Sequence, residues 1–252
     1  MNAVLSDALK KLRLSGLAES LAVRLQEAQA NRLAHAEFLE LVLADELAVR
    51  QERQIARRVK AAAFREMKTL EDFDWDFNRS IKRRPVFDLA AGHFVRQKKD
   101  VLLVGPPGVG KSHLAQAIGL ACAKAGYTVL YRSIFDAVRD LLHDEAFEGH
   151  ERVMARYLLP DLLILDDMGI KQLPKRSGEF LFEIIMRRHQ LKSTMMTSNR
   201  PLEDWGKLIG DVPAATAILD RLLSEAQIIE VTGKSYRLRG KPESKQPEAK
   251  ND

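Results

Sequence analysis

The amino-acid sequence predicts an α/β fold built on a parallel five-stranded sheet, preceded by a small all-helical domain. Two observations support the sheet. From Asp100 onward, short apolar runs alternate with amphipathic helical stretches, a pattern typical of parallel sheets covered by helices on both faces. Hydrophobic residues make up 46% of the 252 residues but aromatic residues only 6%, so we expect a core of mainly aliphatic side chains. This composition excludes an intrinsically disordered chain.

Residues 1–68 contain no proline and one glycine, Gly16, and we predict that they form helices throughout. Ser15 and Gly16 separate a short first helix from a second, and a longer helix follows His35. We expect this domain to serve self-association or to contact DNA or a partner.

The helical pattern breaks after residue 68, where EDFDWDF and SIKRRP indicate a basic linker over residues 69–99. The α/β domain is predicted to span residues 100–239. The polar tail over residues 240–252 contains two prolines and is predicted to be disordered.

Five apolar runs are the predicted strands of the sheet: DVLLVG, TVLYR, DLLILDD, STMMTSN and AQIIEVTG. The intervening stretches of helical periodicity predict helices over residues 111–124, 134–159 and 179–190.

The charge is modest overall, +5, so its distribution matters more than its size. Residues 79–99 carry seven basic side chains against one acid, and residues 50–60 carry five against one. Such clusters can contact nucleic-acid phosphates or simply form solvated surfaces. The single cysteine, Cys122, excludes an intramolecular disulfide and a multi-cysteine zinc site. The chain shows neither a secretory apolar stretch nor a run near the ~20 residues of a membrane span, so we expect a cytoplasmic protein.

The most specific motif is GPPGVGKS over residues 105–112, which matches G-x-x-x-x-G-K-[ST] between a predicted strand and a predicted helix. Its glycines let successive N–H groups converge on phosphate oxygens, and the following helix directs its positive end at the same anion. We predict that Lys111 reaches the outer phosphates and that the Ser112 hydroxyl binds Mg²⁺. The predicted nucleotide-binding residues of this loop are Gly105, Pro106, Pro107, Gly108, Val109, Gly110, Lys111, Ser112 and His113.

A pair of acids follows the apolar run LLIL further along the chain. We predict that Asp166 holds Mg²⁺, directly or through water, and that Asp167 orients or deprotonates the attacking water. The alternative is a pair of acids that caps a strand beside a turn. One strand–helix unit separates the two motifs, which is typical of P-loop ATPases with an additional strand and less typical of small nucleotide kinases.

Two further polar residues are candidates for the site. Asn199 ends the fourth predicted strand and is expected to point toward the γ-phosphate; alternatively, it is a turn residue before Arg200. Arg221 follows Asp220, and adjacent residues do not face each other on a helix, so we do not expect local pairing to explain it. It is either a group that completes a neighbouring subunit's site or a surface arginine.

The sequence at this point resembles the IstB type of AAA+ ATPases, helper proteins encoded beside the transposase in one class of bacterial insertion sequences. These are similar to the DnaC and DnaI helicase loaders. The resemblance covers about residues 5–239 and rests on LRLSGLAESL, GPPGVGKSHLAQAIG, LLILDDMG and STMMTSNRPLEDW. The most discriminating block is IGDVPAATAILDRLLSEAQIIEVTGKSYRLR.

The resemblance implies an AAA+ core with a helical module in front and little of the usual helical lid behind. It implies that Asn199 is a first sensor, that Arg221 is an arginine finger given to the adjacent subunit, and that Arg237 is a second sensor. It also implies ATP and Mg²⁺ as cofactors, a homo-oligomer assembled with ATP on duplex DNA, and a partner transposase of the same element. The helix-rich insert at residues 133–159 corresponds to the initiator-type insert that helps contact DNA.

DNA binding is expected to depend on salt and little on base sequence, since the basic clusters offer phosphate contacts. The predicted DNA contacts are Arg139, Lys171, Lys175 and Arg176, with solvated surface charge as the alternative at each. Because the catalytic acid is Asp167 where most AAA+ proteins have Glu, we expect slow intrinsic turnover, with ATP chiefly an assembly switch. A replicative helicase loader and a small-molecule kinase are the alternatives to a transposition helper.

Overall fold

The computed structural model describes residues 3–144 and 149–239, and its contacts divide the chain into two compact units, residues 1–58 and 59–252. Each unit is described by itself. The predicted disordered tail, residues 240–252, lies outside the described residues. No helix in the described parts of the chain combines the length and apolarity needed to cross a membrane.

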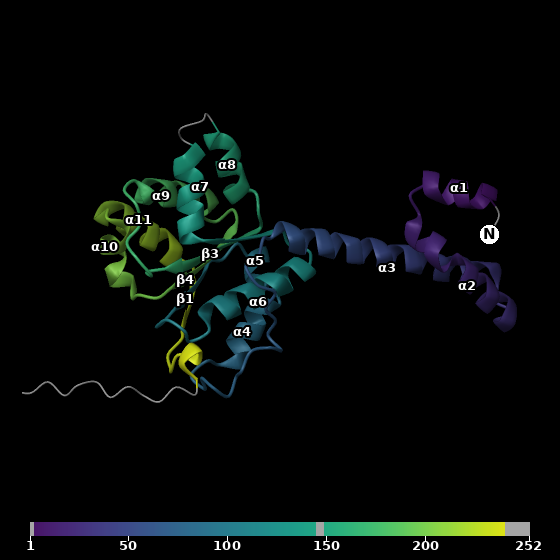
Figure 1. The fold of residues 1–252 in the computed structure, drawn as a ribbon, viewed down its shortest axis with the longest axis horizontal. Helices are drawn as coiled ribbons and strands as arrows, with labels where there is room; N and C mark the ends of the chain where they lie inside the picture. The colour runs from purple at the N-terminus through teal and green to yellow at the C-terminus, as the bar shows by residue number, and fades with distance from the viewer. Residues whose placement is uncertain (1–2, 145–148, 240–252) are drawn as a thin grey trace, which may run out of the picture. The chain divides into compact units, whose positions relative to one another are not determined.

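The first unit is helical (Figure 1). It contains α1 (Ala3–Lys11), α2 (Ser15–Asn31) and most of α3 (His35–Ala61), whose last residues, 59–61, belong to the second unit. Its small core consists of Leu9, Leu17, Leu21 and Val42. The buried carboxylate of Glu46 accepts the Leu17 N–H at 2.9 Å and the Arg50 Nε–H at 2.7 Å. An acid on α3 therefore satisfies a backbone donor in the first turn of α2, which would otherwise lack a partner.

The second unit is built on a five-stranded sheet in which all neighbouring strands are parallel. The strands are β1 (Val101–Val104), β2 (Val129–Ser133), β3 (Leu162–Met168), β4 (Ser193–Ser198) and β5 (Gln227–Glu230). Their order is β2-β3-β4-β1-β5, so β4 separates β1 from β3. The five predicted strands and the predicted parallel sheet are confirmed.

Helices cover both faces of the sheet (Figure 1), which explains why apolar residues of the strands are buried on both sides. One face packs on α4 (Arg83–Ala90), α5 (His93–Arg96) and α6 (Lys111–Lys124) through residues such as Leu103 and Ile164. The other face, with Leu102 and Leu163, packs on a second group of helices. These are α7 (Ile134–Asp144), α8 (His150–Leu158), α9 (Ser177–Arg188), α10 (Trp205–Ile209) and α11 (Val212–Leu223). Short 3₁₀ turns occur at η2 (Leu202–Asp204) and η3 (Tyr236–Leu238).

Two segments differ from the sequence expectation. The helical stretch predicted over residues 134–159 contains two helices in its described residues, α7 and α8, with Gly149 at the N-cap of α8. The stretch predicted as a linker, residues 69–99, belongs to the second unit and contributes to its core. Its apolar side chains are spaced among charged ones, so no continuous apolar run reveals them in the sequence. The buried members are Leu70, Phe73, Ile81, Val86, Leu89, Phe94 and Val95.

A buried carboxyl at the start of the sheet makes stability depend on pH. Asp100 precedes β1, is 8% exposed and accepts the Thr194 N–H at 2.7 Å. Burial raises the pKa of Asp100 from 3.8 to about 6, although the Thr194 N–H and Arg188 act in the opposite direction. Because the folded protein holds this proton more tightly, the stabilising contribution is complete below about pH 4 and is lost as the pH rises through about 6.

We therefore expect Asp100→Asn, which keeps the acceptor oxygen but cannot ionise, to stabilise the protein more at neutral pH than at about pH 4. The difference between the two pH values should reach at most about 3 kcal/mol. Urea unfolding of both proteins across this pH range measures it. Asp88→Asn, which makes the same acid-to-amide change at an exposed position of α4, is the matched control. A stability difference for Asp100→Asn that stays constant with pH would contradict this assignment.

Candidate nucleotide-binding site

The loop between β1 and α6 has the geometry that its motif predicts. It follows β1 directly, and α6 begins at Lys111 with Gly110 as its N-cap. Gly108 and Gly110 have φ angles of +83° and +109°, a region that strains other residues. A Cβ at Gly110 would also come within 2.7 Å of the Phe73 ring. Glycine is therefore required here both by the backbone conformation and by the packing around the loop.

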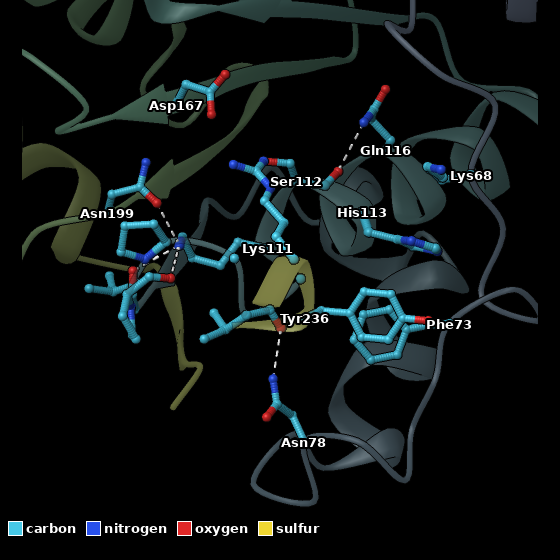
Figure 2. Close-up of a pocket in the computed structure, with 18 of the residues that line it drawn as sticks. Lys68, Phe73, Asn78, Lys111, Ser112, His113, Gln116, Asp167, Asn199 and Tyr236 are labelled. Atoms are coloured by element: carbon cyan, nitrogen blue, oxygen red, sulfur yellow. Dashed lines mark hydrogen bonds between the residues drawn. The ribbon is translucent and has the colours of Figure 1, made fainter. Parts of the chain in front are cut away.

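Lys111 and Asn199 are brought together at the carboxyl ends of β1 and β4. The Lys111 Nζ donates to Asn199 Oδ1 at 2.7 Å and to the carbonyl oxygens of Gly105 and Pro106 at 2.8 Å each, as Figure 2 shows. The Asn199 N–H donates to Met168 O at 2.7 Å and so ties this residue to the end of β3. Burial lowers the pKa of Lys111 to about 8, although the charges of Asp166 and Asp167 oppose this shift.

Asp166 is fully buried at the end of β3, and its carboxylate is surrounded by donors. Its Oδ1 accepts the Ser112 hydroxyl at 3.0 Å, the Asp167 N–H at 2.9 Å and the Thr197 hydroxyl. Its Oδ2 accepts the Tyr131 hydroxyl. Burial, together with the nearby Asp166 charge, raises the pKa of Tyr131. Sequence reasoning missed Tyr131 and Thr197, because each is only one of several polar side chains in its strand and nothing local marks it as a partner of Asp166.

Asp167 lies in a local irregularity of the sheet. The register between β3 and β4 shifts between Leu165 and Met168, so β3 holds one extra residue there. Asp167 has a φ of +70°, and its N–H also lies 3.0 Å from Thr197 Oγ1. Its side chain is 14% exposed and lines the pocket. Burial and the neighbouring Asp166 raise the pKa of Asp167, whereas Arg65 and Arg237 lower it.

These groups open into a cavity of about 1240 Å³, large enough for a nucleotide. All the residues predicted from the loop, 105–113, line it, together with Asp167, Asn199 and Arg237. Asp166 does not line the cavity but lies directly behind it, hydrogen-bonded to the lining residue Ser112. The lining residues that sequence reasoning missed include Arg65, Lys68, Phe73, Asn78, Gln116 and Tyr236.

Two distant segments form one wall of this cavity. The Phe77 and Tyr236 rings meet edge to face at 5.0 Å, and Arg239 lies over both rings and pairs with Asp74 at 2.7 Å. The buried Asn78 amide donates to the carbonyl oxygens of Val109, at 3.3 Å, and Lys234, at 3.1 Å. The residues before α4 and after β5 thus brace the phosphate loop from outside the motif.

Arg221 does not reach this cavity. It lies on α11 with a 41% exposed side chain and forms an ion pair with Asp220. The expectation that Asp220 cannot pair with it was wrong, because an arginine side chain is long enough to fold along the helix toward the preceding residue. A role for Arg221 in a neighbouring subunit's site stays a prediction.

The four predicted DNA contacts are exposed and lie outside the cavity lining. Arg139 pairs with Asp136 at 2.7 Å. The Lys171 Nζ lies 4.8 Å from the centre of the Phe135 ring. Arg176 pairs with Glu179 at 3.5 Å, and Lys175 precedes it. Their roles on DNA stay predictions.

Within the described ranges, no cluster of three or more His, Cys, Asp or Glu side chains is placed to hold a metal ion. This is compatible with Mg²⁺, which is usually held by one or two protein oxygens together with phosphate oxygens and water. Ser112 Oγ and Asp166 Oδ1, 3.0 Å apart, are the donor set that fits.

A phosphate loop after β1, an acid pair in the last part of β3 and a polar side chain after β4, the strand between them, define a P-loop protein of the AAA+ class. Its fold resembles that of the DnaC helicase loader, with 24% identity and a TM-score of 0.54 over 65% of this chain and 96% of that one. It also resembles that of DnaI, with 23% identity and a TM-score of 0.56 over 66% of this chain and 91% of that one. AMPPCP-bound DnaA from Aquifex aeolicus is 23% identical, with a TM-score of 0.56 over 67% of this chain. The match covers 51% of the DnaA chain, so this chain spans about half of that one. Identities this low show the fold alone.

The chain belongs to the family described as IstB-like ATP binding protein, which matches residues 7–244. It is 37% identical to the insertion sequence IS21 putative ATP-binding protein of Pseudomonas aeruginosa, over 94% of this chain and 89% of that protein. It is 33% identical to the insertion sequence IS5376 putative ATP-binding protein of Geobacillus stearothermophilus, over 92% of both. The resemblance drawn from the sequence motifs is confirmed.

Proposed function

We propose that this protein is an ATP-dependent DNA-binding helper of transposition. In this function it oligomerises on duplex target DNA, recruits or activates the transposase of the same element, and is reset by ATP hydrolysis. The observation that carries the ATPase part is the convergence of Lys111, Asn199 and Asp167 at one cavity, with Asp166 hydrogen-bonded to Ser112 in its wall. Membership of the IstB-like family supports the link to transposition.

Binding of ATP uses groups that already share one site. Lys111 gives up its hydrogen bonds to Asn199 and the loop carbonyls and binds the outer phosphates instead. The negative charge of the phosphates raises the pKa of Lys111, which burial lowers in the free protein. Ser112 and Asp166 would hold Mg²⁺, which when bound would neutralise phosphate charge.

Hydrolysis then depends on Asp167, which orients the attacking water and accepts its proton as the oxygen bonds to the γ-phosphorus. The bond from that phosphorus to the bridging oxygen breaks, and ADP and phosphate are released. Asn199 contacts the γ-phosphate from the end of β4, Arg237 contacts the nucleotide from the C-terminal side, and Arg221 acts on the neighbouring subunit. The carboxylate of Asp167 is one methylene shorter than that of Glu, so turnover without DNA is slow. A rate of tens per second for the isolated protein would contradict this.

The test of the DNA-bound assembly is a binding titration with ATP, Mg²⁺ and duplexes of unrelated sequence, together with the mass of the complexes formed. We expect oligomers that bind all duplexes similarly. If six or more phosphates are contacted, affinity should fall about a thousand-fold between about 50 and 200 mM salt. Electron microscopy of the same complexes gives their geometry.

Three results would count against the proposal. A chain that stays monomeric and does not bind DNA when saturated with a non-hydrolysable ATP analogue contradicts the assembly step. One strongly preferred site in random DNA contradicts sequence-independent binding. Co-purification with a ring helicase, and not with the transposase, favours the helicase-loader alternative.

A further inference from the structure

One arginine outside the recognised motifs contacts the acid that acts on water. Arg65 Nη1 lies 3.3 Å from Asp167 Oδ2, although 102 positions separate the two residues in the chain. Arg65 follows the end of α3 and is absent from every motif that identifies the site. The contact therefore depends on how the segment before the core is held against it.

The backbone on either side of Arg65 is attached to two elements of the site. The carbonyl of the buried Ala62 accepts the Tyr131 N–H of β2 at 2.8 Å. The Glu66 N–H donates to Gln116 Oε1 of α6 at 2.9 Å. Phe64 lies against the Tyr131 ring at a centroid distance of 6.2 Å and packs on the core. Arg65 is thus a surface side chain on a fixed piece of backbone that faces the acid pair.

The backbone of Asp167 is held in place, so its side chain stays near Arg65. Its backbone conformation is fixed by the bulge, and its N–H is used by Asp166 and Thr197. The other charged or titratable groups around it are Asp166, Tyr131, Lys111 and Arg237. Among the ion pairs of the described residues, the only one that involves Asp167 is the pair with Arg65.

We propose that Arg65 is a positioning residue that restrains Asp167: its guanidinium holds Oδ2, and this pair must open before Asp167 can orient the attacking water. The inference rests on the proposed ATPase function. Because the Arg65 side chain is 53% exposed, the restraint is weak, and its removal should shift the equilibrium by at most about five-fold.

The experiment compares wild type with Arg65→Gln in steady-state ATP hydrolysis, with and without duplex DNA, and measures the Kd for AMPPCP. We expect kcat to rise two- to five-fold in Arg65→Gln, while KM for ATP and Kd for AMPPCP stay within two-fold. Arg65→Lys, which keeps the positive charge, should remain close to wild type. Lys124→Gln removes the same charge from the exposed last turn of α6, outside the cavity lining and the proposed DNA contacts, and should change nothing.

The outcomes separate the two hypotheses. An unchanged or lower kcat in Arg65→Gln, with hydrolysis by wild type intact, overturns this inference alone. A changed KM or AMPPCP affinity at constant kcat also overturns it, because Arg65 would then contact the nucleotide. If wild type fails to hydrolyse ATP under every condition, the proposed ATPase fails and this inference fails with it. Should Arg65→Gln fail to fold, a kcat for Arg65→Lys below that of wild type overturns the restraint.

Discussion

Lys111→Ala is expected to weaken ATP binding by at least about a hundred-fold. Lys111 is 4% exposed, and its amine is hydrogen-bonded to oxygens of the loop and of Asn199. The outer phosphates of ATP would bind next to this amine. Alanine removes the only cation at the centre of this loop's motif, and loss of two charge-assisted hydrogen bonds costs about 3 kcal/mol or more. Titration with a fluorescent ATP analogue measures the change in Kd.

The matched control for this change lies on the same helix. Lys124→Ala removes the same side chain from the exposed last turn of α6 and should bind ATP as wild type does. Circular dichroism and urea unfolding establish that Lys111→Ala is folded, which is necessary because two loop carbonyls lose their donor. A Kd for Lys111→Ala within three-fold of wild type would refute the phosphate-binding role.

Asp167→Asn is expected to bind ATP and DNA nearly as wild type does while hydrolysis falls by about 10²–10⁴-fold. An amide fills the same space at the bulge but cannot accept a proton from water. The carboxylate of Asp166 and the Ser112 hydroxyl, which hold Mg²⁺ in the proposed mechanism, are unaltered. Single-turnover hydrolysis and an ATP titration on the same preparation separate the two effects.

For this variant, Asp88→Asn provides an acid-to-amide change at an exposed position far along the chain from the acid pair, and should hydrolyse ATP normally. Loss of ATP binding in Asp167→Asn would mean that its role is misassigned. Hydrolysis at the wild-type rate would require another group to activate the water.

The elements predicted most accurately are those that depend on residues close together in the sequence. The predicted helix 111–124 has the bounds of α6, because the phosphate-loop motif is followed directly by a helix. The five runs that contain short apolar stretches form the five strands, and β1 to β4 are buried because helices cover both faces of the sheet, whereas β5 is largely exposed. The phosphate loop is similarly local, since φ-positive glycines and the following helix depend on neighbouring residues.

Predictions that required long-range contacts were less successful. The segment 69–99 looks polar along the chain, yet seven of its scattered apolar residues, Leu70, Phe73, Ile81, Val86, Leu89, Phe94 and Val95, are buried in one core. Spacing rules for Cβ atoms on a helix did not anticipate the Arg221–Asp220 pair, because they ignore the reach of a long side chain.

The sequence by itself determined which chemistry the protein carries: a loop that binds phosphate, two acids at a strand end, and a polar residue after the next strand. Only the tertiary structure decided which other groups surround those acids. Tyr131 and Thr197 come to Asp166 from the strands on either side, and Arg65 comes to Asp167 from beyond the sheet. The physical reason is that backbone conformation follows from adjacent residues, whereas the environment of a buried charge depends on which distant segments pack against it.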